Sequence, residues 1–400
     1  MLRTNTVDAC PRESLVSARR HVAAVASLVG VMFVATTLPT PLYPLFQERY
    51  GFGELLVTVV FSIYAFGVIA GLLAFGNLSD EVGRKPVLLL GIALSGTSAL
   101  LFVFAGSLAP IFAGRVFSGL SAGIFTGTAT AMLVDLAPGG RRRLGSLVAV
   151  VVNLGGLGLG TLLAGLLADY CTSPLRLPFL VQLGLLVPAV LGLLVTPETV
   201  ERRAFRLRLQ HLRVPAEVRG VFIRGASVGF GGFAVAGVFG SVAPAFLGQI
   251  LGRTSHALAG LVVFILFSSS IVGQLLVVRV SDRRALVWGS ALLAAGVGLL
   301  ALALWAESLA ALIASAGVVG IGLGGVIGAG LAAINQRAPV EQRGETASSF
   351  FVVMYVGLSL PVIGVGVVAQ SFGLRAAGIA FSAAVAALVL AVLASLTRPD

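Results

Sequence analysis

Charged side chains are scarce in this 400-residue sequence. Asp, Glu, Lys and Arg together make up only 11% of it, whereas soluble domains contain about 25%. The same chain is 58% hydrophobic and has a mean hydropathy of +1.04. A water-soluble fold is therefore excluded, because it has no way to bury this much apolar surface. We expect an integral membrane protein whose surface faces lipid.

Cysteine and histidine are also rare. Cys10 and Cys171 are expected on opposite sides of the membrane, which excludes a disulfide between them. His21, His211 and His256 are scattered and show no metal-ligand spacing. The sequence contains neither a phosphate-binding loop nor a nucleophile–base pair. We therefore expect no metal, no cofactor and no enzymatic activity.

Acidic residues are fewer than basic ones, and the net charge is +11. In a soluble protein this excess would suggest nucleic acid. The loops between the apolar runs of the chain, which are given in the next paragraph, are numbered here in chain order. Of the 27 Lys and Arg residues, 22 lie in or next to the N-terminus, the even-numbered loops and the C-terminus, whereas 4 lie in the odd-numbered loops. The positive-inside rule explains this distribution. It predicts no nucleic-acid partner and two cytoplasmic termini, and we expect a bacterial inner (cytoplasmic) membrane.

Apolar runs of about 20 residues predict membrane-spanning helices, because the hydrocarbon core needs that length. The sequence contains twelve such runs, at 22–46, 54–76, 86–106, 109–136, 144–168, 177–196, 220–249, 257–279, 285–305, 308–335, 346–370 and 374–396. A polar linker, 198–219, divides them into two sets of six, within 1–197 and 220–400. The linker is rich in arginine and is expected to lie near anionic headgroups. Its arginines include Arg202, Arg203, Arg206, Arg208 and Arg213.

The two halves repeat each other. Pro41 and Tyr43 correspond to Pro244 and Phe246, and Ala137-Pro138 corresponds to Ala338-Pro339. Asp80 similarly corresponds to Asp282. The number of residues that separates the two members of a pair is nearly the same for all of these pairs. Both copies start on the same side of the membrane, which is typical of a parallel repeat about an axis along the membrane normal. The predicted fold is all-α, with two pseudo-symmetric six-helix bundles.

The segment between the second and third runs carries the most specific motif. Residues 76–85 read GNLSDEVGRK, and a weaker copy occurs near Asp282. This segment resembles the loop 2–3 signature of the major facilitator superfamily, Gly-x-x-x-Asp-x-x-Gly-Arg-Lys/Arg, at every defined position. The resemblance extends over nearly the whole chain. It implies a transporter with twelve spans and alternating access, and it says little about the substrate.

The charged residues of this loop are expected to form a conformational latch. If the halves close at the inner face, Asp80 can lie against the positively polarised start of span 11, near Glu345-Thr346. The resemblance implies that Arg84 pairs with Asp135. The copy, Asp282, would face the start of span 5 near residues 145–146, and Gly83 and Lys85 complete the motif. Alternatively, Arg84 and Lys85 only anchor the topology.

Span 4 contains a charge inside the membrane. Arg115 is followed four residues later by Gly119, as in the span 4 motif of the superfamily. A charge at mid-bilayer costs about 2.5–3.5 kcal/mol or more, so it is a functional candidate by default. Arg115 would then bind an anionic group or lower the pKa of a nearby acid. The alternative is that its side chain extends to the outer headgroups.

Spans 5 and 11 contain candidate hinges. Span 5 keeps the glycine spacing of the antiporter signature at Gly156 and Gly160, but Thr161 replaces the signature proline. We expect these glycines to let spans 5 and 8 approach closely. In span 11, Pro361 is expected to kink the helix.

A central site is expected between the halves. Three prolines between residues 39 and 44 disrupt the outer half of span 1, which is tolerated where a helix lines a cavity. Polar side chains in several spans are candidates for its wall, although each one alone is equally explained by an interhelical hydrogen bond. These residues are Tyr43, Tyr64, Asn153, Gln274 and Tyr355. The remaining wall would be apolar.

No Asp or Glu lies in the middle of a predicted span, so proton coupling would have to use a loop acid such as Glu48 or an acid near a span end, and uncoupled transport is the alternative. The acids near span ends are Glu54, Asp80, Asp135, Asp169 and Asp282. By resemblance to the efflux branch, export of a hydrophobic or amphipathic small molecule, with protons as a possible exchanged ion, is the first expectation. A carrier of a small anionic metabolite that uses Arg115 is the second, and a receptor or scaffold without transport is the third. The lipid bilayer is the expected environment and a monomer the default.

Overall fold

The computed structural model describes residues 11–76, 78–138, 141–201, 210–277, 279–339 and 342–397, and the regular secondary structure of these residues consists of helices joined by turns and irregular segments. The first part contains α1 (Pro11–Thr37), η1 (Thr40–Leu42), α2 (Tyr43–Tyr50), α3 (Glu54–Phe75), α4 (Leu78–Val82), α5 (Arg84–Val103), α6 (Leu108–Ile124), η2 (Phe125–Ala129), α7 (Thr130–Asp135), α8 (Arg142–Tyr170) and α9 (Leu177–Val195). The second contains η4 (Ala216–Val218), α10 (Arg219–Ser241), α11 (Ala243–Gln249), α12 (His256–Val277), α13 (Asp282–Ala306), α14 (Leu309–Arg337) and α15 (Arg343–Thr397). Cys10 and four linker arginines lie outside the described residues: Arg202, Arg203, Arg206 and Arg208.

Within the described residues, 11 helical segments are long and apolar enough to cross a membrane. The last of them, α15, has 55 residues and is interrupted at Gly373, whose φ of 82° and ψ of 160° are not helical. Glycine adopts this left-handed φ without the Cβ penalty of other residues. Because α15 therefore contains two consecutive spans, the structure is consistent with the twelve predicted spans.

The prolines of span 1 break the helix as predicted. α1 ends at Thr37, a short 3₁₀ turn follows, and α2 restarts at Tyr43. Proline lacks the N–H that an intrahelical bond needs, so the carbonyls at the end of α1 are left without helical partners. This break has a direct consequence for Arg115, described below.

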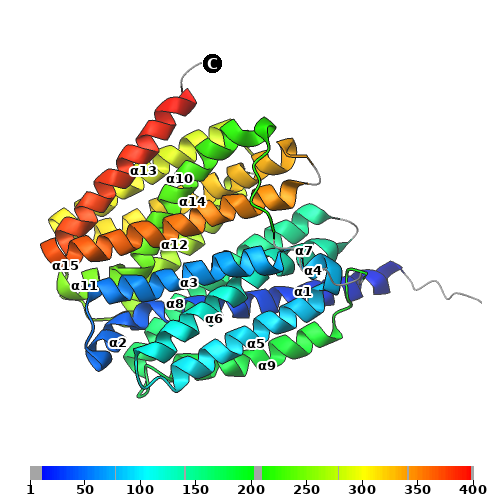
Figure 1. The fold of residues 1–400 in the computed structure, drawn as a ribbon, viewed down its shortest axis with the longest axis horizontal. Helices are drawn as coiled ribbons and strands as arrows, with labels where there is room; N and C mark the ends of the chain where they lie inside the picture. Colours follow the sequence, from blue (N-terminus) through cyan, green and yellow to red (C-terminus); the bar gives the residue numbers. More distant parts are fainter. Residues whose placement is uncertain are drawn as a thin grey trace, which may run out of the picture.

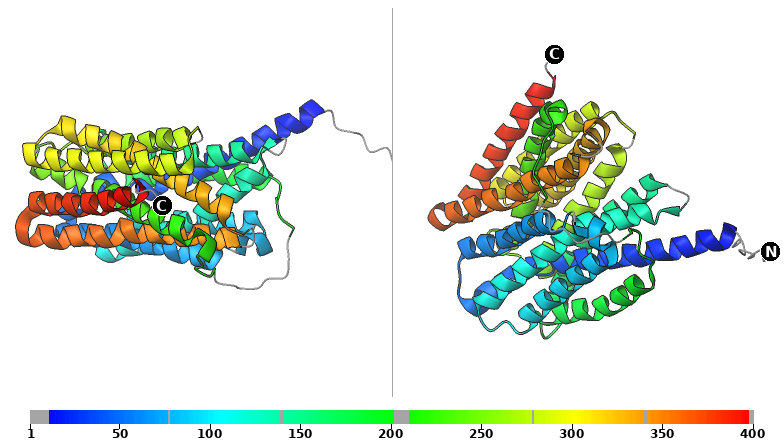
Figure 2. Two further views of the ribbon diagram at one scale, coloured as in Figure 1. Left: turned by 90° about the horizontal axis from the view of Figure 1, so that it is seen from above. Right: turned by 45° about the vertical axis from the view of Figure 1, so that its right-hand side comes forward.

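The helices form two adjacent groups (Figure 1). Helices α1–α9 lie together on one side, and α10–α15 lie on the other. Figure 2 shows the two groups from other directions, and in its right-hand view the start of α1 and the end of α15 lie far apart. The side of the molecule on which the linker between α9 and α10 lies is called the linker side below, and the other the far side.

Two seams join the groups. In the first, α3 packs on α15, and the Ser62 hydroxyl donates to the Ser359 carbonyl at 3.1 Å. In the second, α8 packs on α12, and the Thr161 hydroxyl donates to the Gly260 carbonyl at 3.1 Å. A Cβ on Gly165 would collide with the His256 carbonyl. Backbones this close require small residues, as is usual between membrane helices.

Spans 5 and 8 approach each other closely, as predicted, but they do so at Gly165 of the glycine-rich stretch and not at Gly156 and Gly160. A Cβ on either residue would collide with backbone of α1, at the carbonyls of Gly30 and Val34. These two glycines are four residues apart and share the face of α8 that packs on α1. The face toward α12 carries Thr161 and Gly165 instead.

The predicted kink at Pro361 is not seen as a change in backbone conformation. Pro361 lies inside α15, where the backbone angles are helical, and the non-helical φ/ψ pair of this helix is at Gly373. A hinge role for Pro361 stays a prediction.

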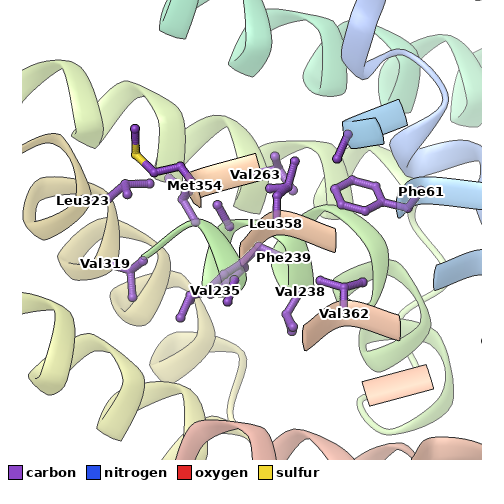
Figure 3. Close-up of a cluster of buried hydrophobic side chains, with 14 of the residues drawn as sticks. Phe61, Val235, Val238, Phe239, Val263, Val319, Leu323, Met354, Leu358 and Val362 are labelled. Carbon is purple, nitrogen blue, oxygen red and sulfur yellow. The ribbon is translucent and has the colours of Figure 1, made fainter. Parts of the chain in front are cut away.

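Apolar packing links the two groups near the middle of the molecule. Figure 3 shows Phe61 of α3 extending toward side chains of α10 and α15, among them Phe239 and Leu358. The Phe61 ring lies against Gly240, where a Cβ would come within 2.9 Å of it. The groups therefore share a packed apolar interface beside the cavity described next.

Candidate functional site

A central cavity of about 750 Å³ lies between the two groups of helices. Its wall includes Thr36 and Tyr64 from the first group and Phe233 and Tyr355 from the second. It extends to the ends of helices on the linker side, where its lining residues include Arg143, Ser146, Asp282 and Gln336. The wall is mainly apolar and holds few charges, which is typical of small-molecule sites.

Arg115 of α6 is the charged group deepest in this wall. Its side chain is buried, with 1% of the residue exposed. Nη1 donates to the Thr36 carbonyl at 3.1 Å, and Nε donates to the Val60 carbonyl at 3.4 Å. The guanidinium carbon lies 4.7 Å from the ring centre of Tyr64 and 5.7 Å from that of Phe61. Aromatic faces at these distances attract a cation.

The alternative in which Arg115 extends to the outer headgroups is wrong, because its guanidinium is held by interior groups. Thr36 lies in the last turn of α1, immediately before the proline break. Carbonyls at a helix C-terminus carry partial negative charge and lack intrahelical partners. The break in span 1 therefore supplies an acceptor for the buried cation of span 4. Among the described residues no carboxylate forms an ion pair with Arg115.

Four of the predicted polar lining residues do line the cavity. Tyr64, Asn153, Gln274 and Tyr355 come from α3, α8, α12 and α15, so both groups contribute. The side chains of Tyr64 and Tyr355 interact with each other across the interface. Tyr355 also packs edge-on against Phe233, with ring centres 5.7 Å apart.

The prediction that Tyr43 lines the cavity is wrong. Tyr43 is 1% exposed, and its hydroxyl has no hydrogen-bond partner among the described residues. It starts α2, beyond the proline break, and packs in the hydrophobic core. The proline-disrupted segment does line the cavity, but it does so through Thr36, Thr37 and Thr40.

Gly119 has a packing role rather than a place in the cavity wall. A Cβ on Gly119 would collide with the Tyr64 carbonyl and lie 2.9 Å from the Gly67 Cα. Gly119 therefore lets α6 approach α3 and positions the backbone that carries Tyr64. The candidate ligand-binding groups are the four polar residues and Arg115.

Gly119→Val is expected to destabilise the folded protein by about 1–3 kcal/mol, because overpacked interiors force backbone shifts. The measurement is the thermal midpoint of the detergent-solubilised protein, followed by size-exclusion chromatography. Gly298→Val is the matched control, since a Cβ at Gly298 meets no atom within 4 Å. Equal midpoints for the two variants would contradict the packing role.

On the linker side, Arg84 connects three segments. Its Nε donates to Asp135 Oδ2 at 2.9 Å, and its Nη1 lies 3.0 Å from Asp80 Oδ1. The pairing of Arg84 with Asp135 is thus present, and it ties the start of α5 to the end of α7. The arginine is 9% exposed and the Asp135 side chain 36% exposed, so water reaches the carboxylate more than the guanidinium. Anchoring topology alone does not explain a cation bound in this way.

Glu198 completes this cluster and was missed by the sequence analysis. Its carboxylate accepts the backbone N–H groups of Arg84 at 2.9 Å and Lys85 at 3.0 Å, at the start of α5. An acid is stabilising at a helix N-terminus. Gly83 has a φ of +109°, and a Cβ there would lie 2.7 Å from Glu198 Oε2. Glycine is therefore required both by the turn and by the approach of the carboxylate.

Lys85 binds the C-terminal end of a helix, whereas Glu198 binds an N-terminal end. Its Nζ donates to the carbonyls of Leu194 at 2.9 Å and Thr196 at 2.7 Å, at the C-terminus of α9. A cation is favourable there. Together, Lys85 and Glu198 fix the loop of residues 78–85 to the end of span 6.

Asp80 and Asp282 lie at the linker-side mouth. The Asp80 side chain is 63% exposed and pairs with Arg84. Within the described residues it makes no ion pair with the start of α15. Asp282 begins α13 and lines the same cavity as Ser146 of α8. Its expected contact with the start of α8 stays a prediction. The cavity reaches between the groups at this mouth, so these acids are not clasped across it.

On the far side, an acid of one group caps a helix of the other. Asp169, near the end of α8, accepts the backbone N–H groups of His256 at 2.9 Å and Ala257 at 3.0 Å. It also accepts the Ser255 hydroxyl at 2.7 Å and lies 3.0 Å from His256 Nδ1. All four contacts meet the start of α12. This arrangement, called the far-side clasp below, joins the groups where the cavity ends.

A second far-side contact accompanies the clasp. Gln249, at the end of α11, donates to Glu54 Oε1 at 2.7 Å, and Gln47 donates to the same oxygen at 3.2 Å. Glu54 begins α3, so this contact also joins the two groups. In the sequence, Glu54 and Asp169 are distinguished only as acids near span ends. Their signal was weak: an acid at one span end and a serine N-cap, Ser255, before another.

Comparison of the sequence with models of protein families decides which family the chain belongs to. The sequence model of the Major Facilitator Superfamily matches residues 25–239 and 225–400. The chain belongs to the major facilitator superfamily. This membership identifies an integral membrane transporter rather than an enzyme.

Two curated proteins and one solved structure show which known members of the superfamily this chain is similar to. A chloramphenicol resistance protein of Pseudomonas aeruginosa is 28% identical over 302 residues, covering 71% of this chain and 68% of that protein. A class H tetracycline resistance protein of Pasteurella multocida is 29% identical over 187 residues, covering 45% and 44%. The second match thus spans less than half the length of that relative. A bacterial homologue of the human lysosomal transporter Spinster, solved in an inward-facing, unoccupied conformation, covers 95% of this chain and 98% of its own with a TM-score of 0.71 and 14% identity.

Proposed function

We propose that this chain is a secondary transporter that exports amphipathic small molecules by alternating access. The observation that carries the proposal is the central cavity, which both groups of helices line and which is bounded at the far side by contacts between the groups. A transporter must expose its site to one side at a time, and this geometry fits one of the two required states.

The linker side is proposed to be the cytoplasmic side of a bacterial inner membrane, following the distribution of arginine and lysine. The structure then corresponds to an inward-open state, and the likeness to a fold solved in an inward-facing conformation supports this interpretation. The moving units are proposed to be 1–197 and 220–400, with 198–219 as the linker and a monomer as the transporting unit.

Export is favoured over uptake by two observations. Relatives that the chain resembles are named resistance proteins for tetracycline and chloramphenicol. In addition, an apolar cavity reached from the cytoplasmic side suits amphipathic molecules that enter cells through lipid. The specific substrate of either relative is not carried over to this chain.

In the opposite state, the latch is proposed to form at the linker side. Closing of the two groups would bring the exposed Asp80 to the start of α15, whose first turn contains Thr346. The far-side clasp has the same chemistry, since there too a carboxylate of one group binds the helix N-terminus of the other. The two latches would therefore alternate.

Proton exchange is part of the proposal. Among the described lining residues, Asp282 is the carboxylate that reaches the cavity, so it is the candidate to bind a proton during transport. Gly156, Gly160 and Pro361 are retained as candidate positions at which α8 and α15 bend.

The test uses the purified protein in liposomes with a pH-sensitive dye inside. Addition of a lipophilic drug-like compound, with a pH gradient imposed, should cause protein-dependent drug movement and a coupled change in internal pH. Drug movement without a pH change would replace exchange with uniport. No movement of a broad panel of amphipathic compounds would favour a receptor or scaffold.

A further inference from the structure

We propose that the substrate is an amphipathic organic anion whose acidic group binds Arg115 while its apolar body lies among the cavity aromatics. This inference rests on the export function proposed above and specifies its substrate class. Its starting point is a cation that the protein itself does not neutralise.

The protein leaves much of the guanidinium's binding capacity unused. A guanidinium has five N–H donors. Among the described residues, two of them have acceptors, and both acceptors are neutral carbonyls, those of Thr36 and Val60. An acidic ligand group would supply the missing negative charge, and arginine binds carboxylates with a matching planar geometry.

The charges of the cavity wall favour the same sign of ligand. The described lining residues include Arg115 and Arg143 and one carboxylate, Asp282. Arg143 and Asp282 both lie at the linker-side mouth, so Arg115 alone determines the charge of the deep end. A ligand cation would have to approach this uncompensated guanidinium, whereas an anion would be attracted to it.

The surroundings of Arg115 define the rest of the ligand. Phe61 and Tyr64 flank the guanidinium, and Tyr355 and Phe233 continue the aromatic wall from the second group. Flat apolar rings pack well against such side chains. A ligand with an acidic group on one end and an aromatic or aliphatic body therefore fits the wall from Arg115 toward the mouth.

A matched ligand series tests this directly on the whole purified protein. The three probes are 2-naphthoate, 2-naphthamide and 2-naphthylmethylammonium, which share one ring system and differ in charge. Their dissociation constants are measured at pH 7.5 by microscale thermophoresis. We expect 2-naphthoate to bind at least about tenfold more tightly than the amide, as is usual for hydrogen bonds to charged groups. Equal or weaker binding of 2-naphthoate, or no binding of any probe, would overturn the proposal.

The variant Arg115→Gln is expected to abolish the preference for 2-naphthoate while leaving binding of 2-naphthamide within about twofold. Arg253→Gln, which removes a cation in the loop before α12, is the control and should keep the preference. If Arg115→Gln does not fold, Arg115→Lys keeps the charge without the planar fork and should reduce the preference. A full preference in either folded variant at position 115 would also overturn the proposal.

Transport is measured separately with the same probes in liposomes. Selective binding of 2-naphthoate without any flux would contradict the export function and leave the anion site standing. Flux of a drug-like cation or neutral compound, with no preference for 2-naphthoate in binding, would leave the export function standing and remove the anion site.

Discussion

Asp169→Ala is expected to open the far side of the protein. The substitution removes four contacts by which one carboxylate holds the start of α12. Because these contacts join the two groups, their loss penalises the closed far side. Each 1.4 kcal/mol changes the ratio of two states tenfold. We expect the closed far side to lose about that much stabilising free energy or more. Hydrogen bonds to charged groups contribute about 1.5–3 kcal/mol each, and exposure to solvent lowers this contribution.

The measurement is labelling of a cysteine placed in the cavity wall. In a background of Cys10→Ser and Cys171→Ser, Val150→Cys is treated with a membrane-impermeant maleimide in right-side-out and inverted vesicles. The parent should react from the linker side, and the Asp169→Ala variant should gain reaction from the far side by about tenfold. Glu307→Ala is the matched control, because Glu307 pairs with Arg375 within its own group. Unchanged far-side labelling of Asp169→Ala would show that the clasp does not hold the state.

Asp80→Asn is expected to reduce transport at least tenfold while leaving membrane insertion and abundance unchanged. In the present state the Asp80 carboxylate is largely exposed and pairs only with Arg84 among described groups, so its replacement does not disturb the packed core. In the proposed opposite state it would bind the start of α15, where loss of its charge weakens the latch. The expected defect is therefore in turnover and not in folding.

Initial transport rates of Asp80→Asn and the parent in liposomes, normalised to reconstituted protein, check this expectation. Glu201→Gln, another exposed acid on the same side, serves as the control. Normal transport by the Asp80→Asn variant would remove the latch from the account. A loss of abundance would instead place Asp80 in the stability of the fold.

The positions of the spans followed from the sequence because length and hydropathy determine them. The break in span 1 followed from proline chemistry, and the contact between Arg84 and Asp135 followed from the family motif. Each of these features depends on local sequence or on a motif whose partners occupy a known loop. The burial of Arg115 was one of two alternatives, and its contacts decided between them.

The rotation of each helix about its axis was not predictable. Gly156 and Gly160 were assigned to the wrong neighbour because α8 is apolar on most sides, and hydrophobic periodicity then does not define which face meets which helix. Tyr43 was misplaced because the prolines indicate that the segment lines a cavity but do not determine which of its side chains face it. The caps that Asp169 and Glu198 form were missed because each caps a helix that is remote in sequence, and only tertiary structure brings an acid to such an end.

The distance between the groups at each rim tests the central claim most directly. Spin labels at Arg141→Cys and Arg337→Cys report on the linker side, and labels at Ser107→Cys and Arg253→Cys report on the far side, with all four positions exposed. Pulsed electron resonance is recorded with and without substrate and a pH gradient. Rocking of two groups about a shared cavity predicts that the linker-side distance shortens as the far-side distance lengthens. Distances that stay fixed on both sides in a protein that is transporting would contradict it.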